Sequence, residues 1–122
     1  MTLTEQLALQ EIERVKTYAE LKKTWHFGLG AIPQDIINKA INAINVLCAV
    51  RDIENVFSYP EADGTISLII EYNGEEYLDI DIDNEELIHW SHEEYIGNSH
   101  TSLYSDKSSL EQMVTYVKGM QL

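Results

Sequence analysis

Residues 63–83 read DGTISLIIEYNGEEYLDIDID. Two runs of alternating apolar and polar residues lie in this stretch, with Asp63-Gly64 before the first and Asn73-Gly74 between them. Such alternation is typical of half-buried strands, and Asn-Gly is a strong signal for a hairpin turn. The stretch therefore predicts an antiparallel β-hairpin around which the rest of the chain is organised.

The length of the hairpin loop decides which side chains share a face. A two-residue loop would place the isoleucines of the first run beside the aspartates of the second on the buried face. A three-residue loop of Tyr72, Asn73 and Gly74, with Gly74 left-handed in a G1 bulge, instead pairs Glu71 with Glu75. We predict this loop, because it gives one uniformly apolar face: Ile66, Leu68, Ile70, Leu78, Ile80 and Ile82.

The opposite face of the predicted hairpin is a row of carboxylates with two apolar side chains near its middle. Its members are Ser67, Ile69, Glu71, Glu75, Tyr77, Asp79, Asp81 and Asp83. We expect the apolar face to be core and this face to meet water or a partner.

The length of 122 residues indicates one domain, residues 1–122, large enough to bury a core without disulfides. The single cysteine, Cys48, excludes an internal disulfide and predicts a buried, inert thiol. No apolar block follows a basic start, and no run approaches the roughly 20 apolar residues of a membrane span. These features favour a cytoplasmic protein that does not enter a membrane.

The charge is strongly acidic, with 21 acidic against 8 basic side chains and a net charge of −13. Residues 52–94 contain fourteen acids and no lysine or arginine, so the acidity belongs to the predicted sheet. This composition argues against direct binding of nucleic acid. Solubility and protection of sheet edges are an alternative explanation of the same excess.

Helices are predicted before and after the strands. Thr2 and Glu5 form a capping box before a helix at about 3–24, and a second helix at about 33–50 starts at Pro33. Ser108 with Glu111 predicts a second capping box, opening a last helix that ends near Gly119.

Further strands are predicted at about 56–59 and 86–92, with Ile88 and Trp90 pointing inward. Residues 91–107, rich in Ser, His, Asn and Gly, are predicted to be a functional or poorly ordered loop. The expected fold is a two-layer α+β domain in the order α-α-β-β-β-β-α, with an antiparallel sheet of about four strands packed on helices.

Part of the chain resembles a group of short uncharacterised bacterial and phage-borne proteins. The resemblance covers residues 25–83 and rests on Trp25-x-x-Gly28-x-Gly30-Ala31-x-Pro33, followed by Pro60-x-x-Asp63-Gly64-x-Ile66 and a hairpin. That group shows Trp-Asp-Gly-x-Gly-Ala before the helix, whereas His26-Phe27 stands here and adds one residue. The resemblance implies the same architecture and no particular activity.

The sequence contains two patterns of possible metal ligands. Asp79, Asp81 and Asp83 resemble the start of an EF-hand loop, but the required glycine and the last glutamate are replaced by Asn84 and Trp90. The second pattern is His89, His92 and Glu93, with His100 nearby in the chain. Residues three apart converge on a helix but point to opposite faces of a strand, which argues against this site.

Motifs of nucleophilic catalysis and phosphate binding are missing from the sequence, so we expect no enzyme and no cofactor. A continuous carboxylate surface instead suits a basic protein partner, as in an inhibitor, an immunity protein or an antitoxin. Tyrosines 72, 77, 95 and 104 would suit such an interface. The predicted partner-binding residues are Ile69, Glu71, Glu75, Tyr77, Asp79, Asp81 and Asp83. The alternatives are a small metal-dependent enzyme using His89, His92 and Glu93, and a homodimer formed through edge strands.

Overall fold

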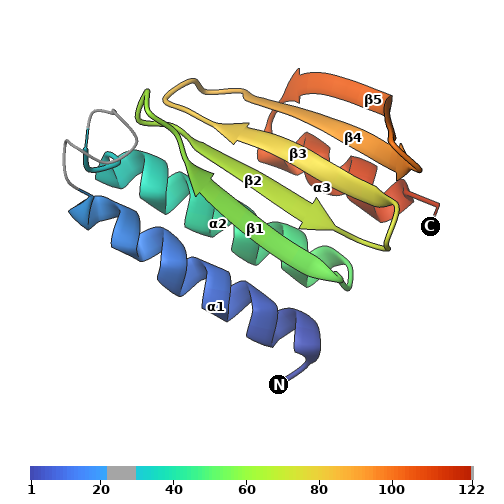
Figure 1. Ribbon diagram of the computed structural model, residues 1–122, viewed down its shortest axis with the longest axis horizontal. Helices are drawn as coiled ribbons and strands as arrows, with labels where there is room; N and C mark the ends of the chain where they lie inside the picture. The colour runs from blue at the N-terminus through green and yellow to red at the C-terminus, as the bar shows by residue number, and fades with distance from the viewer. Residues whose placement is uncertain (22–29, 122) are drawn as a thin grey trace.

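The computed structural model describes residues 1–21 and 30–121 (Figure 1). The helical elements are α1 (Leu3–Thr17), the short 3-10 helix η1 (Tyr18–Glu20), α2 (Gln34–Val50) and α3 (Leu110–Gly119). The strands are β1 (Asn55–Pro60), β2 (Ile66–Glu71), β3 (Glu76–Ile82), β4 (Ile88–Ile96) and β5 (Ser99–Ser108). The predicted α+β class is confirmed, with one strand more than expected.

The five strands form one antiparallel sheet in chain order, β1-β2-β3-β4-β5. Figure 1 shows α1, α2 and α3 on the same side of this sheet, which leaves two layers. We call the side that carries the helices the inner face and the opposite side the outer face. Within the described residues, no helix has both the length and the apolar character needed to cross a membrane.

The core lies between the inner face and the helices. All six residues of the predicted apolar hairpin face are fully buried: Ile66, Leu68, Ile70, Leu78, Ile80 and Ile82. Ile37, Ala40, Ile44 and Leu47 from α2 are equally buried, as the apolar spacing of that helix predicts. The inward orientation predicted for Trp90 is confirmed too, since only 4% of this residue is exposed.

The predicted hairpin loop is wrong in detail. Glu71 lies opposite Tyr77, not Glu75, so the register differs by two residues. Gly74 is not left-handed; the Asn73 Oδ1 instead accepts the backbone N–H groups of Glu75 and Glu76, both at 2.9 Å. Because side chains alternate with a period of two, an even shift keeps the same residues on each face. The residues predicted for the buried face are therefore correct although the predicted loop is wrong.

Tyr72 belongs to the core and not to an interface. Its ring is 8% exposed, and its backbone N–H donates to the carbonyl oxygen of Glu76 at 3.0 Å across the loop. Burial of this large side chain contributes to the core beside the longer loop.

Residues 91–107 are not a loop, which is the main error of the sequence-based expectation. They form the end of β4 and almost all of β5, joined at Gly97, which has a positive φ of 62°. Every residue of β5 before Ser108 is exposed, so no apolar alternation marks the strand. Backbone pairing with β4 holds β5 in place where side-chain burial does not.

The first helix ends earlier than predicted. The capping box of Thr2 and Glu5 is confirmed, but α1 stops at Thr17 and continues only as the single turn η1. Tyr18 then turns into the core, where its hydroxyl lies 2.8 Å from Ser58 Oγ on β1. The expected helical residues 22–24 lie outside the described residues.

The last helix starts one residue later than predicted. Ser109 and Gln112 form its capping box, in place of Ser108 and Glu111. Ser108 is instead the buried end of β5, and its hydroxyl accepts a hydrogen bond of 2.7 Å from Trp90 Nε1. The helix ends at Gly119, as expected.

Candidate functional site

The outer face of the sheet is left uncovered by the described helices (Figure 1). Alternation along each strand decides which side chains reach it. Their partners across the strands form three rows: Asn55, Glu71, Tyr77, Glu93 and Ser102; Phe57, Ile69, Asp79, Ser91 and Ser105; and Tyr59, Ser67, Asp81, His89 and Lys107. Glu75, Tyr95 and His100 lie beyond the first row, at the tips of the hairpins.

Carboxylates crowd the middle of this face. The sequences of β1, β2, β3 and β4 contain no lysine or arginine. Asp79 lies at the centre, and its pKa is raised by partial burial and then by the negative charges of Asp81, Glu93 and Glu61. The pKa of Tyr77 is raised by burial and by Glu93 and Asp79. Asp79 therefore lies among like charges that oppose its ionisation.

The basic side chain on this face is Lys107, at the β5 edge. Its Nζ lies 2.6 Å from Glu85 Oε2 in the turn between β3 and β4, and this contact lowers the pKa of Glu85. His89 Nε2 lies 3.8 Å from the same carboxylate oxygen. Lys107 is thus engaged at the edge and does not neutralise Asp79.

A hollow of about 400 Å³ opens on the outer face beside Asp79, and we call it the aromatic hollow. It is lined by Phe57, Tyr59, Ile69, Glu71, Gly74, Glu75, Tyr77, Asp79, Tyr95 and His100. The Tyr77 hydroxyl lies 2.7 Å from His100 Nδ1, and the His100 ring packs on Tyr95 with centroids 4.6 Å apart. One wall of the hollow is therefore held by a hydrogen bond and ring packing across β3, β4 and β5.

A second hollow of about 340 Å³ lies on the other side of Asp79. Asp81, His89, Ser91, Ser105, Asp106 and Lys107 are among its lining residues. It is more polar than the aromatic hollow and offers hydroxyl and carboxylate oxygens. Asp79 lines both hollows and so stands between them.

The structure brings most of the predicted partner-binding residues together. Those that line the aromatic hollow are Ile69, Glu71, Glu75, Tyr77 and Asp79. Asp81 lies in the second hollow. Asp83 lies past the end of β3, where its Oδ1 accepts the backbone N–H of Glu85 at 2.9 Å and its carbonyl oxygen accepts from Lys39. Its carboxylate thus supports the β3–β4 turn.

Sequence reasoning named Tyr77 and Tyr95 as suited to an interface but missed Phe57, Tyr59 and His100 of the hollow. Phe57 and Tyr59 reach it because β1 pairs with β2, and their alternation with the buried Val56 is the signal that could have placed them. Tyr95 and His100 reach it because they pair across the unexpected β4–β5 hairpin. Gly97-Asn98 was the available turn signal there.

The histidine candidates do not converge. His89 is on the outer face, whereas His92 is buried on the inner face, with Nδ1 2.7 Å from the Tyr116 hydroxyl and Nε2 3.1 Å from Glu76 Oε1. The two histidines therefore lie on opposite faces of the sheet, as their spacing on a strand predicts. Glu93 points outward, away from His92. Over residues 1–21 and 30–121, no three His, Cys, Asp or Glu side chains are grouped so that they could hold a metal ion.

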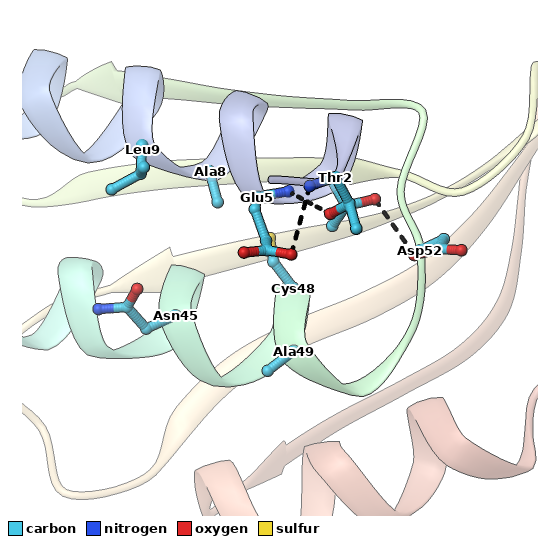
Figure 2. A pocket seen from close by; sticks show the side chains of 9 residues that line it. Thr2, Glu5, Ala8, Leu9, Asn45, Cys48, Ala49 and Asp52 are labelled. Carbon is cyan, nitrogen blue, oxygen red and sulfur yellow. Dashed lines mark hydrogen bonds between the residues drawn. The ribbon is translucent and has the colours of Figure 1, made fainter.

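A separate pocket of about 550 Å³ lies between the start of α1 and the end of α2 (Figure 2). Three of its polar residues already have structural partners: Thr2 and Glu5 form the capping box, and the Thr4 hydroxyl accepts from the backbone N–H of Ile53 at 3.0 Å. Burial raises the pKa of the Cys48 thiol to about 12, so the thiol stays protonated at neutral pH. The pocket lacks an activated nucleophile.

No protein-family model, curated protein or solved structure matches the chain. The resemblance to short bacterial and phage-borne proteins stays a prediction, and Trp25 and Gly28, on which it partly rests, lie outside the described residues.

Proposed function

We propose that the chain is a non-catalytic protein-interaction domain that binds a basic protein through the outer face of its sheet. An inhibitor, an immunity protein or an antitoxin would act in this way. The observation that carries the proposal is the crowding of carboxylates around Asp79, on a face that the described helices leave uncovered and where Lys107, at the β5 edge, is paired with Glu85.

Electrostatics favours a basic partner over other macromolecules. The negative charges of Asp81, Glu93 and Glu61 make ionisation of Asp79 less favourable, and lysine or arginine side chains of a partner would relieve this repulsion on binding. The same field speeds association with a basic protein and repels the phosphates of nucleic acids. Ile69 and Tyr77, half-buried within this field, supply an apolar centre of the kind that anchors interfaces.

The proposal places the protein in the cytoplasm, where the absence of a disulfide is the rule. It also requires no cofactor. Binding would use the rigid sheet as it stands, because backbone pairing on both sides of β2, β3 and β4 holds the face in shape.

The test is to isolate a partner and then to reverse the charge of the face. Protein captured from the source cells by the immobilised chain is identified, purified and titrated against wild-type protein and the double variant Asp79→Lys/Asp81→Lys. We expect a basic partner, affinity that falls as salt rises, and a loss of binding on the order of 100-fold in the folded double variant.

The matched control is Glu13→Lys/Glu20→Lys, which makes the same charge change on α1 and η1. An acidic or neutral partner, or a double variant that keeps wild-type affinity, would rule out the proposal. Circular dichroism of both variants separates loss of binding from loss of fold.

The free edge of β5 favours a second candidate, a homodimer. This ten-residue strand contains no proline, pairs on one side with β4, and exposes Leu103 and Tyr104 at 45% and 43%. Long edges of this kind can pair with another strand. Sedimentation equilibrium would detect the dimer, and Leu103→Pro should dissociate it, since proline removes a backbone donor and strains a strand. A monomer at all concentrations would exclude this candidate.

A further inference from the structure

We propose that the aromatic hollow binds an arginine side chain of the partner. This inference rests on the proposed function and goes beyond it, because it names the group that is bound and the residues that bind it. It depends on three features of the hollow: its aromatic walls, its rim of carboxylates and its size.

The walls of the hollow suit a planar cation. Phe57 and Tyr59 approach from β1, while Tyr77 and Tyr95 approach from β3 and β4. Aromatic faces attract cations, and guanidinium groups stack on them more readily than ammonium groups because they are planar and weakly hydrated. The hydrogen bond between the Tyr77 hydroxyl and His100 Nδ1 holds the Tyr77 ring before anything binds. Less conformational entropy is then lost on binding.

The rim selects a positive charge. Glu71, Glu75 and Asp79 lie among the lining residues, which include no lysine or arginine. Asp79 is half-buried, so water screens its carboxylate less than it screens that of a fully exposed aspartate. A guanidinium group can donate two parallel hydrogen bonds to one carboxylate, whereas lysine offers a point charge. An anionic or neutral group would leave the negative charge of these carboxylates without a counter-charge.

The size of the hollow limits the ligand. Its volume of about 400 Å³ is near the lower end of the range for ligand pockets, about 300–1,000 Å³. Ile69 forms part of the lining and can pack against the methylene groups of a long side chain. An inserted arginine would thus bury its stem on apolar surface and place its charged end between rings and carboxylates.

The experiment is an NMR titration of isotopically labelled protein with N-acetyl-arginine amide. N-acetyl-citrulline amide is the neutral probe of the same shape, and N-acetyl-lysine amide is the non-planar cation. We expect the arginine probe to shift the backbone resonances of Ile69, Tyr77, Tyr95 and His100, and to bind about tenfold more tightly than citrulline. Equal binding of citrulline, equal or tighter binding of lysine, or shifts confined to other surfaces would overturn the assignment.

Variants make the assignment specific. Asp79→Asn should weaken binding of the arginine probe by about three- to tenfold, and Tyr77→Leu should weaken it by a similar factor because the aromatic face is lost. Tyr77→Phe keeps the ring and should change affinity less than Tyr77→Leu does. Glu13→Gln removes one carboxylate from α1 and should leave affinity unchanged. Unaltered binding in both Asp79→Asn and Tyr77→Leu, with spectra that show the folded protein, would reject the hollow as the site.

The two proposals fail differently. Asp81 lies outside the lining of the aromatic hollow, so Asp81→Lys tests the acidic face without changing the hollow itself. If Asp81→Lys loses affinity for the partner while Tyr77→Leu keeps wild-type affinity for it, the arginine site is rejected and the proposed function is retained. The proposed function alone would be rejected if the protein binds the arginine probe while Asp81→Lys and Tyr77→Leu both keep wild-type affinity for the purified partner.

Discussion

Replacing Asp79 by asparagine should stabilise the isolated protein. The Asp79 carboxyl lies half-buried at the centre of the outer face, and its pKa is raised by burial and by Asp81, Glu93 and Glu61. A raised pKa in the folded state means that ionised Asp79 is less favourable there than in the unfolded chain. Asp79 therefore lowers the free energy of unfolding at neutral pH, and asparagine removes this cost.

The expected gain follows from the partners of Asp79. A like-charged neighbour on a sheet surface costs a few tenths of a kcal/mol up to about 1 kcal/mol, and solvent screens the part of this carboxyl that is exposed. We therefore expect Asp79→Asn to raise the free energy of unfolding at pH 7 by about 0.5–1 kcal/mol. In a domain of this size the corresponding rise in Tm is about 2–5 °C. High salt should reduce the electrostatic part of the gain, since the Debye length falls to about 3 Å at 1 M.

The pH dependence gives the sharper test. Wild-type protein carries the full cost above the raised folded-state pKa of Asp79, and the cost falls as pH drops through that pKa. It disappears below the unfolded-state pKa of about 3.9, where the carboxyl is protonated in both states. Urea unfolding followed by circular dichroism should therefore separate wild type from Asp79→Asn at pH 7 and bring them together near pH 3.

Glu13→Gln is the matched control, because Glu13 is exposed on α1 and lies 2.9 Å from Lys16 Nζ. It should give no gain in stability. An Asp79→Asn variant that is less stable than wild type at pH 7, or a gain that is the same at pH 7 and pH 3, would show that the ionised Asp79 carboxylate does not destabilise the fold.

Three further predictions concern the core and the inner face. Ile80→Ala should lower the free energy of unfolding by about 2–5 kcal/mol, because it empties a fully buried site; a loss below 1 kcal/mol in urea unfolding would contradict the packing. Cys48, whose pKa burial raises to about 12, should react with a thiol reagent at pH 8 far more slowly in native protein than in urea, and equal rates would show an open thiol. Tyr116→Phe should cost about 0.5–1.5 kcal/mol, because it loses the 2.7 Å contact with His92 Nδ1 but keeps the ring stacked on Tyr104; an unchanged unfolding midpoint would show that the contact contributes nothing.

Local patterns predicted the elements whose formation depends on burial. The alternation of isoleucine with aspartate in 78–82 placed each side chain on the correct face, even though the loop and the register were wrong. The capping box at Thr2 and the apolar stripe of α2 were also predicted correctly. Both depend on residues that are only a few positions apart in the chain. The capping box predicted at Ser108 was wrong because the Ser108 hydroxyl accepts a hydrogen bond from Trp90 and does not cap the helix.

The candidate site was predicted in part. The acidic residues of β2 and β3 were found because a strand presents every second side chain on the same face. Phe57 and His100 were not found, and Tyr95 was named without a place on this face, since strand pairing brings these residues to the hollow from positions far apart in the sequence. The burial of His92 depends on Tyr116 of α3 and was equally invisible.

The sequence by itself determined the acidity of the sheet, the two faces of the central hairpin and the helices that pack on one of them. Periodicity and charge suffice for these properties, because each is set by neighbours along the chain. The tertiary structure alone decided that β5 is a strand, that Asp79 stands among three other carboxylates, and that aromatic side chains from β1, β3, β4 and β5 enclose a hollow beside it. These properties arise from pairing between strands, and the hydrogen bonds that fix pairing join backbone groups that look alike in every residue.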